Sequence, residues 1–560
     1  MRSHPIRFAL VRPPVEVLHK FSKPVESLAI AYLASALRRN GHDAVLLDGM
    51  LEDWTDEETV NRILNERSDA VGFTTVLQKF PTNLGKITAL LYDSGFRGPI
   101  VVGGHAVSFF ARSILEQVPT IDGVVRGEGE QTIVAIADAL ATGRDWRDAP
   151  GVAFRRNDQV IEQPVRRIRN LDELGNPARD LTADVIRRDG LVAVSTSRGC
   201  HARCSFCSVP RFYGLENGRR LAAGDWLARD PEGCAREIAS LHDRFGLREI
   251  LVVDDEFFGG GQEGRARANV FARELSALNL PVSFAMSCRA ENAVPELIEP
   301  LARAGLAHVF IGLEAGSGAD LKLYGKGHSV EQNVAAVRTV KSLGLSFQPG
   351  FMLFNYRSTL DTVQLGLDFL KEIGELKPTT INSAVDPHYG APLTADMRRQ
   401  GQLNEGALEM TSSYLDPGVA IVKAVASISA EKFISFMNFI ATAQSAITYE
   451  WRRRPPARTD ETQRVLDAFE ESANRMLSQP VLRSLRLIRH GGKTPGEILT
   501  EAIVEIDEAV DDLKVKQSLV AIYLQQREGG IRYVSQLDLI DRYNTSNARQ
   551  EVDGGRFNLV

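Results

Sequence analysis

The sequence predicts an α/β protein with a doubly wound parallel sheet, an incomplete (β/α) barrel and a helical carboxyl-terminal part. Over the first 145 residues, short apolar runs alternate with segments of helical periodicity, as in a parallel sheet covered by helices on both faces. The same alternation returns later in the chain, and long amphipathic helical segments follow it. We therefore expect domains over 1–145, 191–400 and 401–560, with a linker over 146–190.

Length and composition are those of a multidomain globular protein. The chain has 560 residues, of which 44% are hydrophobic and 25% charged, and its 66 basic and 72 acidic side chains give a net charge of −6. A nucleic-acid-binding protein normally carries a basic domain, so we predict no nucleic-acid partner. The amino terminus has no long apolar run, so we predict a cytoplasmic protein without membrane contact.

Five strands are expected in the first region, and each is followed by a helix. The expected strands are Ile6–Val11, Asp43–Asp48, Ala70–Thr74, Pro99–Gly103 and Gly123–Arg126. The expected helices are Leu28–Asn40, Glu57–Glu66, Leu84–Asp93, Ser108–Gln117 and Gln131–Ala141. This order predicts a Rossmann-like sheet, in which ligands bind at the carboxyl ends of the strands.

Small and polar residues gather where these strands end. The residues concerned are Arg12, Pro13, Thr74, Thr75, Leu77, Gly103, Gly104, Gly127, Glu128 and Gly129. A single glycine pair is as consistent with a turn, and a Gly-Glu-Gly-Glu run with the start of a helix. Taken together and in order, we interpret them as a ligand-binding edge.

Three of the five cysteines, Cys200, Cys204 and Cys207, lie within one short segment. Thiolates at this spacing can hold three irons of a four-iron, four-sulfur cluster, which leaves the fourth iron open to a small molecule. A zinc site would need a fourth ligand, and a disulfide would leave one thiol over; both remain weaker alternatives. The remaining Cys234 and Cys288 are expected to be buried in packing.

The C-x3-C-x2-C spacing, with the aromatic Phe206 directly before the last cysteine, resembles the radical S-adenosylmethionine (SAM) superfamily. The resemblance implies a [4Fe-4S] cluster whose open iron is chelated by the amino and carboxylate groups of SAM. It also implies that one electron from the cluster cleaves SAM to a 5'-deoxyadenosyl radical.

The region after the linker alternates strands and helices again. The expected strands are Leu191–Ser195, Glu249–Asp254, Val282–Cys288, His308–Leu313, Ser346–Phe354 and Thr380–Val385. The expected helices between them are Pro231–Phe245, Arg265–Leu278, Val294–Ala304, Val330–Leu343 and Thr359–Ile373. They predict a partial (β/α)6 barrel of the TIM type, with its chemistry at the carboxyl ends of the strands.

Charged residues follow these barrel strands. The resemblance implies that the run Asp254, Asp255 and Glu256 recognises the amino group of SAM and that Glu314, in a G-x-E-x-G segment, lies near the same cofactor. Arg289 suits the methionine carboxylate, because a guanidinium can donate charge-assisted hydrogen bonds to it. Each residue alone could have a purely structural role, but in register with the cysteines we interpret them as a SAM site.

The first region, placed before such a motif, resembles a cobalamin-binding domain. Thr75-x-Leu77 matches its S/T-x-L element, and Gly103-Gly104 matches its glycine pair. The D-x-H-x-x-G motif, whose histidine ligates cobalt in many cobalamin domains, is absent, and His19 lacks the flanking residues of that motif. The resemblance therefore implies cobalamin without histidine ligation of cobalt.

Together, these features resemble cobalamin-dependent radical SAM enzymes of the class B methyltransferase type. The resemblance implies methyl transfer from SAM, via methylcobalamin, to an unactivated carbon of a metabolite, natural product or peptide, with an electron donor such as flavodoxin or ferredoxin. A ring contraction, cyclisation or other rearrangement with the same cofactors is the alternative. The carboxyl-terminal helices, expected over Ala430–Tyr449, Thr459–Met476 and Gly496–Tyr523, carry no motif that we can assign.

Overall fold

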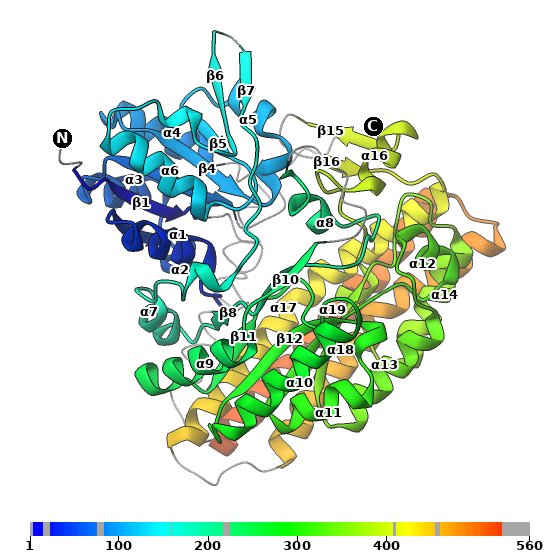
Figure 1. Cartoon of the computed structure of the whole chain (residues 1–560). Coiled ribbons are helices and arrows are strands. Elements are labelled where there is room, and N and C mark those ends of the chain that lie inside the picture. The colour runs from blue at the N-terminus through cyan, green and yellow to red at the C-terminus, as the bar shows by residue number, and fades with distance from the viewer. Residues whose placement is uncertain are drawn as a thin grey trace. The chain divides into compact units, whose positions relative to one another are not determined.

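The fold was described from a computed structural model of the chain (Figure 1). The structure describes residues 4–14, 23–75, 83–157, 159–216, 225–406, 410–453 and 460–528. The chain divides into two compact units. The first unit comprises Met1–Glu314, Gly318–Gly350 and Asp386–Ser413, and the second comprises Ala315–Ser317, Phe351–Val385 and Tyr414–Val560.

The first unit opens with a seven-stranded sheet in the order β2-β1-β3-β4-β5-β6-β7 (Figure 1). Its strands are β1 (Arg7–Arg12), β2 (Asp43–Asp48), β3 (Ala70–Thr75), β4 (Ile100–Gly104), β5 (Gly123–Val125), β6 (Val152–Arg156) and β7 (Gln159–Glu162). The first five pair in parallel, which confirms the predicted doubly wound arrangement. β6 and β7 add an antiparallel hairpin, so the sheet extends beyond residue 145 into the segment that we expected to be a linker.

Helices cover both faces of this sheet. They are α1 (Leu28–Arg39), α2 (Gly49–Glu52), α3 (Asp56–Asn65), α4 (Leu84–Asp93), α5 (Ala111–Gln117) and α6 (Glu130–Ala141), with short 3-10 turns η1 (Ala106–Phe109) and η2 (Trp146–Asp148). The start of α3 is fixed by a capping box, in which Thr55 and Glu58 each accept from the other's backbone N–H.

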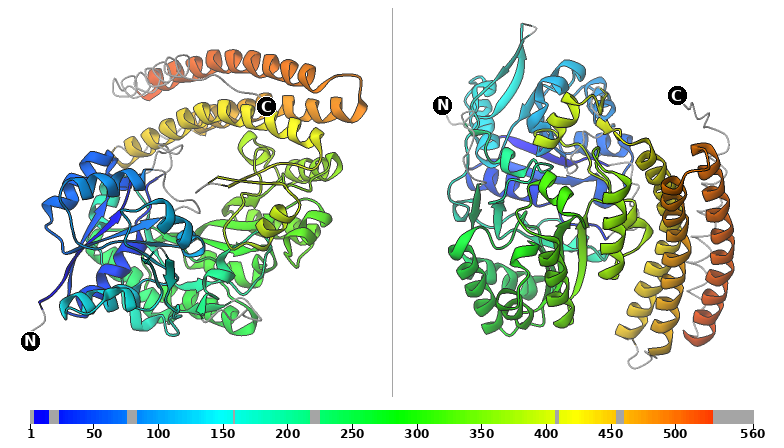
Figure 2. Two further views of the ribbon diagram at one scale, coloured as in Figure 1. Left: turned by 90° about the horizontal axis from the view of Figure 1, so that it is seen from above. Right: turned by 90° about the vertical axis from the view of Figure 1, so that its right-hand side faces the viewer.

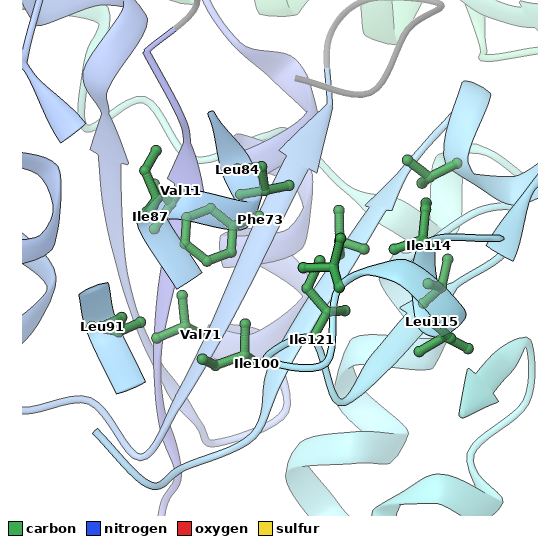
Figure 3. Packing of buried hydrophobic residues seen from close by; sticks show 14 of the residues in the cluster. Val11, Val71, Phe73, Leu84, Ile87, Leu91, Ile100, Ile114, Leu115 and Ile121 are labelled. Atoms are coloured by element: carbon green, nitrogen blue, oxygen red, sulfur yellow. The ribbon is translucent and has the colours of Figure 1, made fainter. Parts of the chain in front are cut away.

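Alternate residues of each buried strand enter two different hydrophobic cores. In β1, Ala9 and Val11 belong to the core beneath α3, α4 and α5, whereas Phe8 and Leu10 belong to the core beneath α1 and α6. Figure 3 shows the first of these cores, where Phe73 of β3 packs among aliphatic side chains. A strand buried on both faces has no polar side, which explains its continuous apolar sequence.

A second sheet of the order β14-β13-β12-β11-β8 follows. Its strands are β8 (Val192–Val194), β11 (Glu249–Val252), β12 (Ser283–Arg289), β13 (Leu306–Glu314) and β14 (Ser346–Phe351). The pairs β8–β11, β11–β12 and β12–β13 are parallel. The connecting helices are α9 (Pro231–Phe245), α10 (Gly261–Ala277), α11 (Pro295–Arg303), α12 (Gly318–Tyr324) and α13 (Val330–Ser342), with the 3-10 turn η5 (Ala290–Asn292) before α11.

The predicted sixth barrel strand, Thr380–Val385, is wrong. Within the described residues, that stretch begins inside the short helix α15 (Pro378–Ile381) and makes one isolated parallel bridge, between Phe354 and Ala384. Pro378 occupies the first helical turn, where its missing N–H costs nothing. The β-branched residues that suggested a strand are thus overridden by the local start of a helix.

Smaller elements complete the first unit. They are η3 (Asp172–Leu174), α7 (Thr182–Arg187), β9 (Ser197–Gly199), α8 (Val209–Phe212), β10 (Trp226–Ala228), α16 (Pro392–Arg399), β15 (Leu403–Glu405) and β16 (Met410–Ser412). β9 pairs antiparallel with β10 directly before the three clustered cysteines. This pairing fixes the amino-terminal end of the cysteine segment.

The second unit contains α14 (Leu360–Glu372), α15 and three long helices, α17 (Pro417–Arg453), α18 (Asp460–His490) and α19 (Pro495–Glu528). The three run side by side (Figure 2). Phe469 of α18 packs against Phe436 and Phe439 of α17, with ring centroids 6.1 and 5.7 Å apart. Each of the three helices begins earlier or ends later than predicted. Within the described part of the chain, no helix is both long and apolar enough to span a membrane.

Candidate functional site

The cysteine segment is a loop between β9 and α8 that is fastened at its centre by Ser205. Its N–H donates to the carbonyl of Tyr324 (2.8 Å), and its hydroxyl donates to the carbonyl of Leu323 (2.7 Å). Its own carbonyl accepts from the N–H of Leu393 (2.7 Å). These three bonds anchor the centre of the loop to the end of α12 and the start of α16.

The donor set fits an iron–sulfur cluster. Cys200, Cys204 and Cys207 are free thiols, and Cys204 is buried. Burial raises the pKa of Cys200 and of Cys207 to about 12, so their thiolates need a metal to stabilise them.

The spacing of the three cysteines differs from that of a single-ion site. Within the described ranges, no three Cys, His, Asp or Glu side chains lie close enough to hold one metal ion. A tetrahedral zinc would bring its sulfurs to about 3.8 Å from each other, whereas a cluster takes one thiolate on each of three irons and needs no such approach.

Asp254 joins the ends of two barrel strands. Its carboxylate accepts from the N–H of Thr196 (2.7 Å) and from the hydroxyls of Thr196 (2.5 Å) and Ser197 (2.8 Å). Both of its oxygens are thus engaged by the chain itself. Of the three acidic residues expected to meet the SAM amino group, Asp254 is therefore the one whose observed contacts are structural.

Asp255 and Glu256 lie beside the cysteine loop. Asp255 accepts from the N–H of Gly199 (3.0 Å), and burial raises its pKa to about 6. Glu256 accepts through Oε1 from Asn292 (3.0 Å), but its buried Oε2 has no hydrogen-bond partner among the described residues. The nearest cation-forming group is His201, whose Nδ1 is 3.6 Å away. An unpaired buried carboxylate oxygen is suited to receive an ammonium group.

Arg289, Glu314 and Phe206 also lie around the cysteine loop or the strand ends. Arg289 donates through Nη1 to the sulfur of Cys204 (3.3 Å). Glu314 has a left-handed backbone, with φ of 69°, and accepts from Nζ of Lys326 (3.2 Å). Phe206 packs edge-on against Tyr324, with ring centroids 5.5 Å apart.

A cavity of about 440 Å³ opens at the carboxyl edge of the first sheet. Eight of the ten residues predicted for this edge line it: Arg12, Thr74, Thr75, Gly103, Gly104, Gly127, Glu128 and Gly129. Pro13 is buried but is not one of the lining residues, and Leu77 lies outside the described residues. The structure therefore gathers most of the predicted edge around one space.

Gly104 shows why a glycine is needed in this wall. Its φ is +133°, and an added Cβ would lie 2.5 Å from Oγ1 and 2.7 Å from the carbonyl oxygen of Thr75. At the neighbouring Gly103, an added Cβ would meet nothing closer than Val125 at 3.6 Å. The close approach of β4 to β3 thus depends on Gly104 and not on the pair as a whole.

Two of the predicted lining residues are already paired. Arg12 forms a buried bidentate ion pair with Asp48, at 2.6 and 2.5 Å, and donates to the carbonyl of Val25 (3.0 Å). Glu128 accepts from Arg167, from the N–H of Ile168 and from Arg198. Their charges are neutralised within the protein, so they shape the cavity without presenting a free charge.

The cavity has a second wall that sequence reasoning missed. Arg198 precedes the first clustered cysteine by two residues, whereas Phe212 and Tyr213 follow the last one, and all three line the cavity. Arg198 donates to Glu128 (2.9 Å) and to Glu130 (2.6 Å), two residues at the start of α6. The position of Arg198 beside the cysteine motif was the one signal in the sequence that could have suggested a role for it. That position did not reveal its ion pairs with Glu128 and Glu130.

His105 was also missed, although it directly follows the glycine pair. Its ring stacks on Phe212, with centroids 4.4 Å apart, and its Nε2 lies 2.9 Å from the hydroxyl of Ser208. Burial and the neighbouring His388 lower its pKa to about 4, so the imidazole is neutral at pH 7. His105 thus ties the first sheet to the helix that follows the cysteines.

Comparison with known proteins assigns the two halves of this site. The B12-binding domain model matches residues 15–137, and the radical SAM superfamily model matches residues 194–365. An uncharacterized methyltransferase of Pyrococcus horikoshii is 31% identical over 376 residues, which cover 66% of this chain and 78% of the relative. The chain belongs to the cobalamin-dependent radical SAM family. It is therefore a radical SAM enzyme, and its family implies a [4Fe-4S] cluster, SAM and cobalamin as cofactors.

The chain is also similar to proteins that are not named as methyltransferases. The 4'-phospho-dehydrooxetanocin synthase of Priestia megaterium is 26% identical over 394 residues, covering 65% of this chain and 51% of that enzyme. The solved structure of OxsB with aqua-cobalamin bound matches with a TM-score of 0.72 and 18% identity, over 93% of this chain and 80% of that chain. At that identity, the match to OxsB shows a shared fold.

Proposed function

We propose that this protein is a methyltransferase that moves a methyl group from SAM, by way of cobalamin, to an unactivated carbon of a metabolite or natural product. One observation carries the proposal. The cavity at the edge of the first sheet is walled on one side by Gly103 and Gly104 and on the other by Arg198, Phe212 and Tyr213, which flank the cysteines. A cofactor in that cavity would therefore be held by the same loop that carries the cluster ligands.

The residues of this chain divide the task between them. When bound, the cluster supplies the electron that cleaves SAM, and cobalamin carries the methyl group. The chain holds the cluster with Cys200, Cys204 and Cys207 and offers the unpaired Oε2 of Glu256 to the SAM ammonium. The apolar and glycine-lined cavity excludes water from the nucleotide tail of cobalamin.

Two further parts of the proposal are the electron donor and the ligand of cobalt. A radical SAM enzyme needs a one-electron reductant, and we propose a flavodoxin or ferredoxin for that role. We also propose that no histidine ligates cobalt, because the D-x-H-x-x-G motif is absent from the sequence. The segments 15–22 and 76–82, which include His19 and Leu77, lie outside the described residues.

Anaerobic reconstitution with iron, sulfide, cobalamin and SAM tests the cluster assignment. Under reducing conditions, the wild type should form 5'-deoxyadenosine, and Cys200→Ala, Cys204→Ala and Cys207→Ala should not. Cys234→Ala is the control, because Cys234 is a fully buried cysteine that lies on α9, outside the cysteine loop. Continued formation of 5'-deoxyadenosine by the three cysteine variants would overturn the assignment.

A second test separates methyl transfer from a rearrangement with the same cofactors. With methyl-labelled SAM and the true substrate, a methyltransferase gives a product heavier by one labelled methyl group in place of hydrogen. A product without the label would contradict methyl transfer and favour a ring contraction or cyclisation with the same cofactors.

A further inference from the structure

Arg289 contacts one of the three cluster cysteines. Its Nη1 lies 3.3 Å from the sulfur of Cys204, and both side chains are buried. A guanidinium N–H that points at a thiolate sulfur places a hydrogen bond and a positive charge beside a cluster ligand. At the other two cysteines, the donors are neutral backbone groups: the N–H of Ala202 donates to the sulfur of Cys200 at 3.5 Å, and the N–H of Val209 donates to the sulfur of Cys207.

The guanidinium is held from two further directions. Its Nε donates to Oε1 of Glu291, and its Nη2 donates to the carbonyl of Lys326. The other oxygen of Glu291 lies 3.1 Å from Nδ1 of His328, whose side chain is fully buried. A chain of contacts therefore runs from His328 through Glu291 and Arg289 to the sulfur of Cys204.

The charges along this chain of contacts are defined. The contacts of Glu291 with His328 and Arg289 lower its pKa to about 2 despite its burial, so it is an ionised acceptor at neutral pH. An ionised carboxylate requires a proton on Nδ1 of His328. The Nε2 of His328 has no hydrogen-bond partner among the described residues, so the contact with Glu291 is the interaction that orients the ring.

We propose that Arg289 raises the reduction potential of the cluster through its hydrogen bond to Cys204, and that Glu291 and His328 are positioning residues that keep the guanidinium aimed at that sulfur. This inference rests on the cluster-binding part of the proposed function. It gives Arg289 a role in addition to the expected contact with the SAM carboxylate, since three of its five N–H groups are engaged here.

The physical reason is electrostatic. Reduction adds one electron from the low-potential donor to the cluster and breaks no bond to a cysteine, so its only local consequence is one more negative charge spread over iron and sulfur. A buried guanidinium and an N–H···S hydrogen bond stabilise that extra charge. Their removal should make the cluster harder to reduce.

The test is a redox titration of the reconstituted protein, monitored by electron paramagnetic resonance without SAM or cobalamin. Arg289→Met should retain four irons per chain and shift the midpoint potential to a lower value than that of the wild type. His328→Phe should shift it in the same direction by less. His328→Asn, which can still donate to Glu291, should lie between His328→Phe and the wild type.

Arg303→Met is the matched control. It removes a guanidinium from the exposed face of α11, where Arg303 pairs with Glu299 at 3.7 Å, and should leave the potential unchanged. If Arg289→Met does not retain a cluster, Arg289→Lys should still show a smaller shift in the same direction. Variants of Arg289 and His328 that hold a full cluster and titrate like the wild type would overturn the inference. A wild type that binds no cluster would instead overturn the proposed function.

Discussion

The cavity at the first sheet and the cysteine loop at the second sheet are built from different materials. The cavity is walled mainly by backbone, glycine and apolar side chains, and the charged residues that reach it, such as Arg12 and Glu128, are already paired. Around the cysteine loop, by contrast, the buried Oε2 of Glu256 has no hydrogen-bond partner among the described residues, and Arg289, which is paired with Glu291, also donates to Cys204. We therefore expect the first site to select its cofactor mainly by shape and the second mainly by charge.

One residue belongs to both sites. Arg198 lies in β9, two residues before Cys200, and pairs with Glu128 and with Glu130, the first residue of α6. Its guanidinium also lies over the ring of Tyr32, 5.1 Å from the centroid. A change at Arg198 should therefore affect the cavity and the cysteine loop together, whereas changes elsewhere should separate them.

The largest expected effect on cobalamin binding is at Gly104. Alanine there must displace the backbone of Thr75, because the new Cβ would lie 2.7 Å from its carbonyl oxygen. A distortion that costs about 3 kcal/mol corresponds to roughly a hundredfold loss of cobalamin affinity. Equilibrium dialysis with hydroxocobalamin measures this loss, and the iron content of the reconstituted cluster should stay at the wild-type level.

Gly103→Ala is the control for this prediction. Its new Cβ would be 3.6 Å from Val125, an ordinary contact, so the fold and most of the cobalamin affinity should survive. Equal affinities for Gly103→Ala and Gly104→Ala would show that the shape of this wall does not select the cofactor.

The second effect is at Arg198. Replacement by methionine removes both ion pairs and leaves the buried Glu130 without its partner, which typically costs about 3–5 kcal/mol. We expect a clearly lower thermal midpoint in a melt followed by circular dichroism, together with weaker binding of both cobalamin and the cluster. Arg236→Met removes an exposed ion pair instead and should cost less than about 1 kcal/mol. Similar melts for the two variants would show that Arg198 does not link the sites.

The smallest effect is a pH dependence from His105. Its pKa is about 4 in the folded protein and 6.5 when unperturbed, so the folded state binds fewer protons than the unfolded state between these values. Stability is therefore complete above pH 6.5 and is lost as the pH falls towards 4. Between pH 6.5 and 5 the loss is about 1–2 kcal/mol.

His105→Asn should remove this contribution. Urea unfolding at pH 7 and pH 5 measures it, and the difference between the two pH values should be smaller for the variant than for the wild type. An unchanged difference would mean that the stacked ring of His105 takes up a proton as readily in the folded state as in the unfolded chain, contrary to its burial.

Local patterns in the sequence predicted much of this structure correctly. The first five strands and their helices were found because apolar runs and helical periodicity are properties of contiguous residues. The hairpin β6–β7 lies in the segment that we assigned to a linker, since its pairing with β5 joins residues far apart in sequence. The prediction of a sixth barrel strand was wrong, because a short helix that begins at Pro378 forms there although the stretch contains β-branched residues.

The sequence alone predicted the three cluster ligands and the order of the two cofactor regions, because the spacing of Cys200, Cys204 and Cys207 is local. Only the tertiary structure decided which charges remain available. Asp254 and Arg12 are engaged by Thr196 and Asp48, which lie 58 and 36 residues away, respectively, along the chain. Such pairings depend on distances between strands, and a linear sequence carries no direct measure of them.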